Sequence, residues 1–112
     1  MAKPASRSYS RYSKDAAILL GQLIRRARVE RRITIEELAE RSGLSRGLVH
    51  RIERGDLGCA IGAVFEAAAV VGVRLFDSDQ STLASQISVN ASTLALLPQA
   101  VRTSTAAVKD DF

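Results

Sequence analysis

Two short helical patterns joined by a glycine turn occupy residues 34–55, and their spacing restricts the fold more than any other feature. Thr34 and Glu37 have the spacing of a capping box, in which each side chain accepts from the other residue's backbone N–H. Gly43 suits the left-handed conformation that ends a helix. Two residues separate this glycine from the second helix, and the second of them, Ser45, is a suitable N-cap. So short a connection predicts a helix-turn-helix.

The second helix of this pattern has two different faces. Its apolar residues pack it onto the first helix, and its polar face suits the major groove of DNA. The Thr34 hydroxyl is used for capping, but backbone N–H groups beside it could still bind a phosphate. The candidate DNA-binding residues are Thr34, Ser45, Arg46, Gly47, His50, Arg51 and Arg54.

The residues of that polar face have different expected roles. Arg46 is the strongest base reader, because a guanidinium can bond both O6 and N7 of guanine. Gly47 would let the backbone approach DNA closely, and His50 would either donate to a base or stay hydrated. Arg51 is a base or phosphate contact, whereas Arg54 is better suited to a phosphate.

These residues resemble a known family. RITIEELAERSGLSRGLVHRIERGD, residues 32–56, resembles the Xre/Cro-like helix-turn-helix domain. Residues 11–76 resemble the HipB-like antitoxins, above all in LGQLIRRARVERR before the motif and AIGAVFEAAAVVGVRLFD after it. The segments LALLPQAVR and VKDDF resemble the tail of that group. The resemblance implies an all-α, lambda-repressor-like domain of four to five helices.

The resemblance also shows where this chain departs from the family. Family members often carry glutamine at the position of Ile35 and threonine at that of Leu48. Ile35 could belong to the core, and Leu48 could touch a thymine methyl group or add to the core. Glu53 is expected to pair with an arginine of the domain.

The segment before the motif divides into an arm and a helix. Residues 1–12 mix serine, proline and basic residues and predict a flexible basic arm. Residues 13–77 are expected to form the DNA-binding domain, opening with a helix from about Ser13 to Arg32. Its predicted core stripe is Leu20, Leu23, Ile24 and Ala27. Some of its arginines could face the DNA backbone, namely Arg25, Arg26, Arg28, Arg31 and Arg32.

After the motif, the pattern predicts a helix, a strand and a second helix. The apolar stripe of the first is Ile61, Val64, Phe65, Ala68 and Val71, and Gly72 ends it. Residues 73–77 include a short strand-like run that would need a partner, such as the same strand of a second copy. Residues 78–98 predict a marginal helix ended by Pro98. Residues 99–112 predict a flexible tail, in which Phe112 could anchor to a partner.

Charge and composition narrow the class of protein. Residues 1–56 carry thirteen Lys and Arg against seven Asp and Glu, a net charge of +6, whereas residues 57–112 have a net charge of −2. A basic half that bears the motif fits nucleic acid. The chain has one histidine and one cysteine, Cys59, so no enzyme site, metal site or cofactor is expected. Without a signal peptide or membrane span, the expected location is cytoplasmic and nucleoid-associated.

The leading hypothesis is a homodimeric transcriptional repressor that binds a palindromic operator. The resemblance implies that it is the antitoxin of a HipA-like serine/threonine kinase toxin, and that it regulates transcription of the pair. The alternatives are a stand-alone Xre-type repressor without a toxin partner, and a protein-interaction adaptor.

Overall fold

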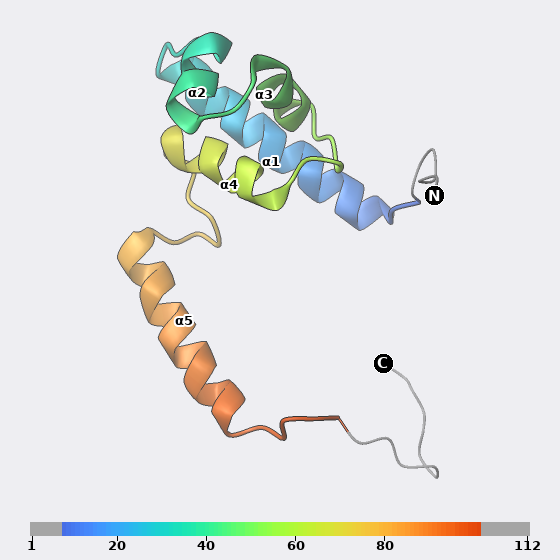
Figure 1. The fold of residues 1–112 in the computed structure, drawn as a ribbon, viewed down its shortest axis with the longest axis vertical. Helices are drawn as coiled ribbons and strands as arrows, with labels where there is room; N and C mark the ends of the chain where they lie inside the picture. The colour runs from blue at the N-terminus through green and yellow to red at the C-terminus, as the bar shows by residue number, and fades with distance from the viewer. Residues whose placement is uncertain (1–7, 102–112) are drawn as a thin grey trace. The chain divides into compact units, whose positions relative to one another are not determined.

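A computed structural model describes residues 8–101, and within this range the chain forms five α-helices (Figure 1). They are α1 (Arg11–Glu30), α2 (Ile35–Ser42), α3 (Arg46–Glu53), α4 (Ile61–Val70) and α5 (Gln80–Ala95). The chain divides into two compact units between Asp77 and Ser78. Most of the predicted N-terminal arm, and Phe112, lie outside the described residues. Among the helices described, none combines the length and apolar character needed to cross a membrane.

Local capping sets the ends of α2 and α3. The Thr34 hydroxyl oxygen accepts from the Glu37 N–H at 3.0 Å, and the Glu37 carboxylate accepts from the Thr34 N–H at 2.9 Å. Gly43 ends α2 in the left-handed region, with φ of 71°. The Ser45 hydroxyl oxygen accepts from the Leu48 N–H at 3.1 Å at the start of α3. The predicted capping box, glycine turn and second N-cap are confirmed.

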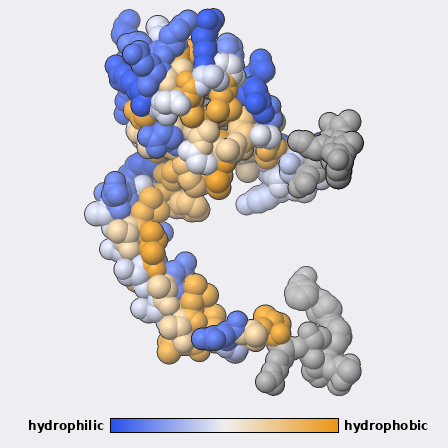
Figure 2. Space-filling model, in the orientation of Figure 1, coloured by the Kyte–Doolittle hydropathy of each residue, from blue (hydrophilic) through white to orange (hydrophobic). Residues whose placement is uncertain are grey.

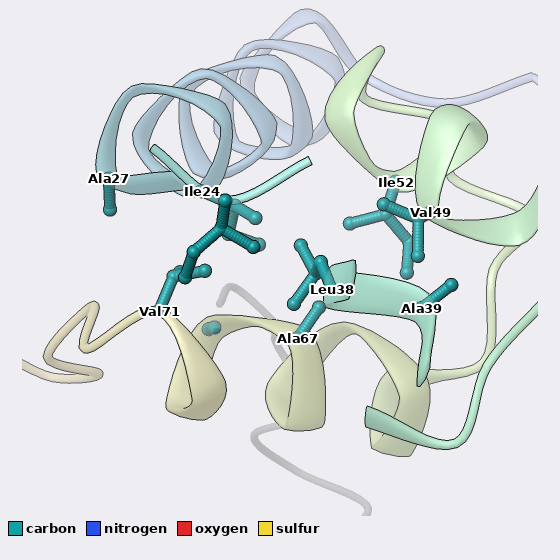
Figure 3. Close-up of a cluster of buried hydrophobic side chains, with 10 residues drawn as sticks. Ile24, Ala27, Leu38, Ala39, Val49, Ile52, Ala67 and Val71 are labelled. Atoms are coloured by element: carbon teal, nitrogen blue, oxygen red, sulfur yellow. The ribbon is translucent and has the colours of Figure 1, made fainter. Parts of the chain in front are cut away.

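The core of the first unit lies between α1, α2, α3 and α4. Figure 3 shows side chains of all four helices pointing toward one another. Close contacts join α2 to α3 and α4, and α1 to α3. Its buried apolar residues are Ile24, Ala27, Ile33, Leu38, Ala39, Val49, Ile52, Ala67, Ala68 and Val71.

Helix α1 differs from its prediction in bounds and in the face that it buries. It begins and ends two residues earlier than expected, because Ser10 caps its start and Arg32 lies in the left-handed region with φ of 57°. Leu23, predicted to be core, is 39% exposed. Gly21 is buried instead, because α3 approaches α1 there: a Cβ on Gly21 would lie 2.5 Å from the Ile52 carbonyl oxygen.

The segment after the motif also differs from its prediction. Ala68 and Val71 are buried as expected, but Ile61 is 68% exposed. No strand forms over the predicted residues 73–77 in the described part of the chain. Phe76 and Asp77 turn the chain instead, with φ of 56° and 54°. A lone strand has no ladder of hydrogen bonds, so its absence from a single chain has a direct physical reason.

Helix α5 forms where a marginal helix was predicted. The Asp79 carboxylate caps its start by accepting from the Thr82 N–H at 2.9 Å. Its C-cap residue is Leu96, so the helix ends just before Pro98. None of its 16 residues is buried.

A buried ion pair joins α1 to α3. Nε of Arg28 donates to Glu53 at 2.6 Å, and a second guanidinium nitrogen donates to the other carboxylate oxygen at 3.0 Å. A third nitrogen of Arg28 donates to the Ile33 carbonyl oxygen at 3.0 Å. The two side chains are 11% and 5% exposed. The predicted pairing of Glu53 with an arginine is confirmed.

Gly21→Ala tests the close approach of α1 and α3. The added methyl group would overlap backbone carbonyl groups, which cannot move aside as a side chain tip would. We expect a loss of about 1–3 kcal/mol in the free energy of unfolding, measured by urea denaturation. Gly62→Ala in α4 is the control, because a Cβ there meets nothing within 4 Å. Equal midpoints for the two variants would contradict the close approach.

Arg28→Met tests the buried pair. It leaves the Glu53 carboxylate buried without a partner, so we expect a loss of about 3–5 kcal/mol in the free energy of unfolding. Arg26→Met is the matched control, since its pair with Glu30 is exposed (73% and 62%) and should contribute less than about 1 kcal/mol. The double variant Arg28→Met/Glu53→Leu should recover most of the loss in the same urea titration. Equal losses in Arg28→Met and Arg26→Met would show that burial of the pair has no special weight.

Candidate nucleic-acid interface

Helix α3 presents one exposed face and one buried face. Val49, Ile52 and Glu53 are turned toward the core. Five of the seven predicted DNA-binding residues are exposed on the other side: Arg46, Gly47, His50, Arg51 and Arg54. Glu53 is the acidic residue of α3, and it is buried against Arg28. The exposed face of α3 is therefore free of negative charge from the helix itself.

The other two predicted residues, Thr34 and Ser45, are the N-caps of α2 and α3. Their hydroxyl oxygens accept from backbone N–H groups, as capping requires. A hydroxyl that accepts in this way still has its own proton to donate. Both side chains can therefore act as donors at the exposed ends of their helices.

Arg46 and Gly47 open the exposed face at the start of α3. Arg46 lies 3.5 Å from the Glu36 carboxylate, and both side chains are about two-thirds exposed (66% and 65%). Such a pair contributes about 0–1 kcal/mol, so Arg46 can leave it at little cost. A Cβ added to Gly47 would meet nothing within 4 Å. No packing contact in the described chain explains this glycine.

Arg51 has a structural partner, Asp56, in addition to its expected role as a DNA contact. Its Nε donates to the Asp56 carboxylate at 2.8 Å, and Asp56 also accepts from the Gly58 N–H at 2.7 Å. The hydrogen bond from Arg51 is the main reason why the pKa of Asp56 is lowered, and it raises the pKa of Arg51. In the sequence, this pair is indicated only by the five-residue spacing of Arg51 and Asp56 across the turn at Gly55. Arg51 thus connects α3 to the loop before α4.

A concavity of about 230 Å³ lies where α1, the start of α2 and the end of α3 meet. Arg25, His50 and Arg54 line it, together with Ile35 and the Arg28–Glu53 pair. Arg28 and Glu53 offset each other's charge, so the net positive charge comes from the two exposed arginines. Of the α1 arginines expected to face DNA, Arg25 lies here, whereas Arg28 is held inside by Glu53.

Three further residues singled out by the sequence, Ile35, Leu48 and Cys59, are half-buried. Ile35 and Leu48 are half-buried against the core, which agrees with the core alternative considered for each. Cys59 is half-buried in the loop before α4, and burial raises the pKa of its thiol. Burial therefore favours the neutral thiol at neutral pH, and the neutral thiol is a poor nucleophile.

The geometry agrees with comparison against known families. A family model described as a helix-turn-helix domain matches residues 19–75, about half of the chain. The matched segment runs from α1 through α4 and contains every predicted DNA-binding residue. None of the curated proteins matches the chain at a significant level. The chain belongs to the helix-turn-helix domain family, and this membership supports a DNA-binding regulator of the Xre-like kind.

Proposed function

We propose that this protein is a sequence-specific transcriptional repressor that inserts α3 into the major groove of DNA. The observation that carries the proposal is the exposed face of α3. It presents Arg46, Gly47, His50 and Arg54 to solvent, while the acidic Glu53 is buried. A helix with this distribution of charge suits the electronegative floor and walls of the groove.

Base reading and phosphate binding fall to different side chains. Arg46 lies at the N-terminal end of α3, the part of a recognition helix that reaches base edges in this docking mode. Gly47 leaves room for the backbone to approach the bases, and His50 lies one turn further along. The hydroxyl groups of Ser45 and Thr34 can donate to phosphates.

The concavity beside α3 suits a backbone phosphate. Arg25 and Arg54 supply positive charge, and the N-terminus of α2 supplies backbone N–H groups and the positive end of a helix dipole. Arg51 has a weaker claim as a DNA contact, because it would have to share its guanidinium with Asp56. We therefore rank Arg25 above Arg51 as a phosphate contact.

The repressor is proposed to act as a homodimer on a palindromic operator. Two copies of α3 would enter successive major grooves about 34–36 Å apart. A second copy could also pair with residues 73–77 and complete the strand that a single chain lacks. The protein would act on DNA in the cytoplasm, associated with the nucleoid, and would perform no catalysis.

A role as the antitoxin of a HipA-like serine/threonine kinase is the more specific form of this proposal. It rests on the likeness of residues 11–76 to HipB-like antitoxins and of residues 94–102 and 108–112 to the tails of that group. In this form the dimer would restrain the kinase and repress transcription of both genes. A stand-alone repressor and an adaptor that no longer reads DNA are the competing functions.

Arg46→Ala and Arg54→Ala separate base reading from phosphate binding. On the operator selected from a random DNA library, Arg46→Ala should cost about 1–3 kcal/mol and relax the preference at one base pair. Arg54→Ala should weaken binding to all sequences about equally and reduce the salt slope of log K by about one. Fluorescence anisotropy over a series of salt concentrations measures both. If both variants lost affinity equally for the operator and for random DNA, the assignment of Arg46 as a base reader would be refuted. Binding that does not depend on salt would favour the adaptor.

The kinase partner is tested by affinity purification of the tagged full chain from its native cytoplasm. We expect a kinase in stoichiometric amount, identified by mass spectrometry. Deletion of residues 99–112 should weaken that complex and leave operator affinity within about twofold, because the proposed DNA contacts all precede α4. Recovery of DNA without a kinase would leave the stand-alone repressor.

A further inference from the structure

Helix α5 has no buried residue along its 16 positions. Its sequence, QSTLASQISVNASTLA, is rich in serine, threonine, asparagine and β-branched residues, which are weak helix formers. At 16 residues, α5 is barely longer than the ~12–15 residues below which isolated helices are marginal in water even with better helix formers. The helix therefore requires a surface to pack against.

The apolar residues of α5 recur at the spacing of a two-helix seam. Leu83, Ile87, Asn90, Leu94 and Leu97 follow one another at steps of four, three, four and three residues. This heptad spacing brings the first four onto one side of α5, and Leu97 directly follows the C-cap residue Leu96. Ile87 is 67% exposed, Leu94 is 65% exposed and Leu97 is 52% exposed. Hydrophobic side chains are visible along α5 in Figure 2.

The chemistry of this seam argues for an identical partner. Residues 80–101 contain no charged side chain. Without lysine or arginine the helix has nothing to bind DNA phosphates or anionic lipid. It offers an external protein no charge to complement, and an identical helix would meet no repulsion between like charges. A neutral surface of this kind suits a second copy of itself.

Asn90 supports the same partner. It lies at the centre of the seam, so it faces Asn90 of a second helix whether the two helices run parallel or antiparallel. In the antiparallel case Ile87 lies opposite Leu94, and Leu83 lies opposite the segment at Leu97 that follows the C-cap of α5. An amide has both donors and an acceptor, so two copies can satisfy each other. A single polar residue in an apolar seam commonly selects the register of the pair.

We propose that α5 pairs with α5 of a second copy along Leu83, Ile87, Asn90 and Leu94, with Asn90 facing Asn90 and with Leu97, just beyond the helix, extending the seam. This pairing specifies the contact surface of the proposed homodimer, and its functional role rests on the proposed operator binding. It assigns the main contact between copies to α5 rather than to residues 73–77.

Ile87→Asp and Val89→Asp form a matched pair of variants of the full chain. Both side chains are β-branched and 67% exposed, but they lie on opposite sides of α5. Sedimentation equilibrium without DNA should give a dimer for the wild type and for Val89→Asp. Ile87→Asp should raise the dimer dissociation constant by at least about 100-fold, since two apolar contacts are replaced by buried charges. A monomeric wild type, or unchanged dimerisation in Ile87→Asp, would overturn the seam.

Crosslinking tests the position of Asn90. In a Cys59→Ser background, Asn90→Cys should form a disulfide-linked dimer under mild oxidation, because the two positions meet at the two-fold axis. Ser92→Cys, on the far side of α5, should remain uncrosslinked. Equal crosslinking of both variants, or of neither, would contradict the proposed register.

Operator affinity of the same variants separates this inference from the proposed function. If Ile87→Asp remains dimeric while the wild type binds its operator, the seam is wrong and DNA reading stands. Suppose instead that the wild type is a dimer, that Ile87→Asp dissociates it, and that the wild type shows no salt-dependent binding to DNA. The seam then stands, and the proposed repressor function is wrong.

Discussion

The arrangement of α1, α2 and α3 depends on the buried pair of Arg28 and Glu53. One guanidinium bonds both carboxylate oxygens in α3 and the Ile33 carbonyl oxygen in the turn before α2. Removing two charges from water is costly, and the fork geometry offsets the cost because it satisfies both carboxylate oxygens. Arg28 therefore holds three segments of the chain together through one side chain.

The proposed DNA-binding surface follows from this pair and from the close approach at Gly21. Both hold α3 against α1, and together they fix which face of α3 points outward. Burial of Glu53 removes the acidic group of α3 from that face. The same pair forms the floor between Arg25 and Arg54, so the structural contact and the positive concavity share residues. A change at Arg28 would thus affect the fold and the proposed phosphate site together.

Features set by local chemistry could be predicted from the sequence, and features set by distant contacts could not. The capping box at Thr34 and the turn at Gly43 involve residues within one helical turn of each other, so their spacing was sufficient. The burial of Gly21 in place of Leu23 depends on how closely α3 approaches α1, which periodicity along α1 does not reveal. The strand expected over residues 73–77 depends on pairing with a second copy, so its absence from the described single chain leaves that pairing a prediction.

The two units differ in charge, and this difference would separate dimerisation from DNA binding. The first unit, residues 1–77, carries fourteen Lys and Arg against nine Asp and Glu, a net charge of +5, whereas residues 80–101 of the second unit carry no charged side chain. Added salt weakens contacts to phosphates steeply but does not weaken an apolar seam. A dimer joined through α5 would therefore persist at an ionic strength that releases DNA. Both α3 helices would then bind and leave the operator as one preassembled unit, so the second half-site would be engaged at high effective concentration.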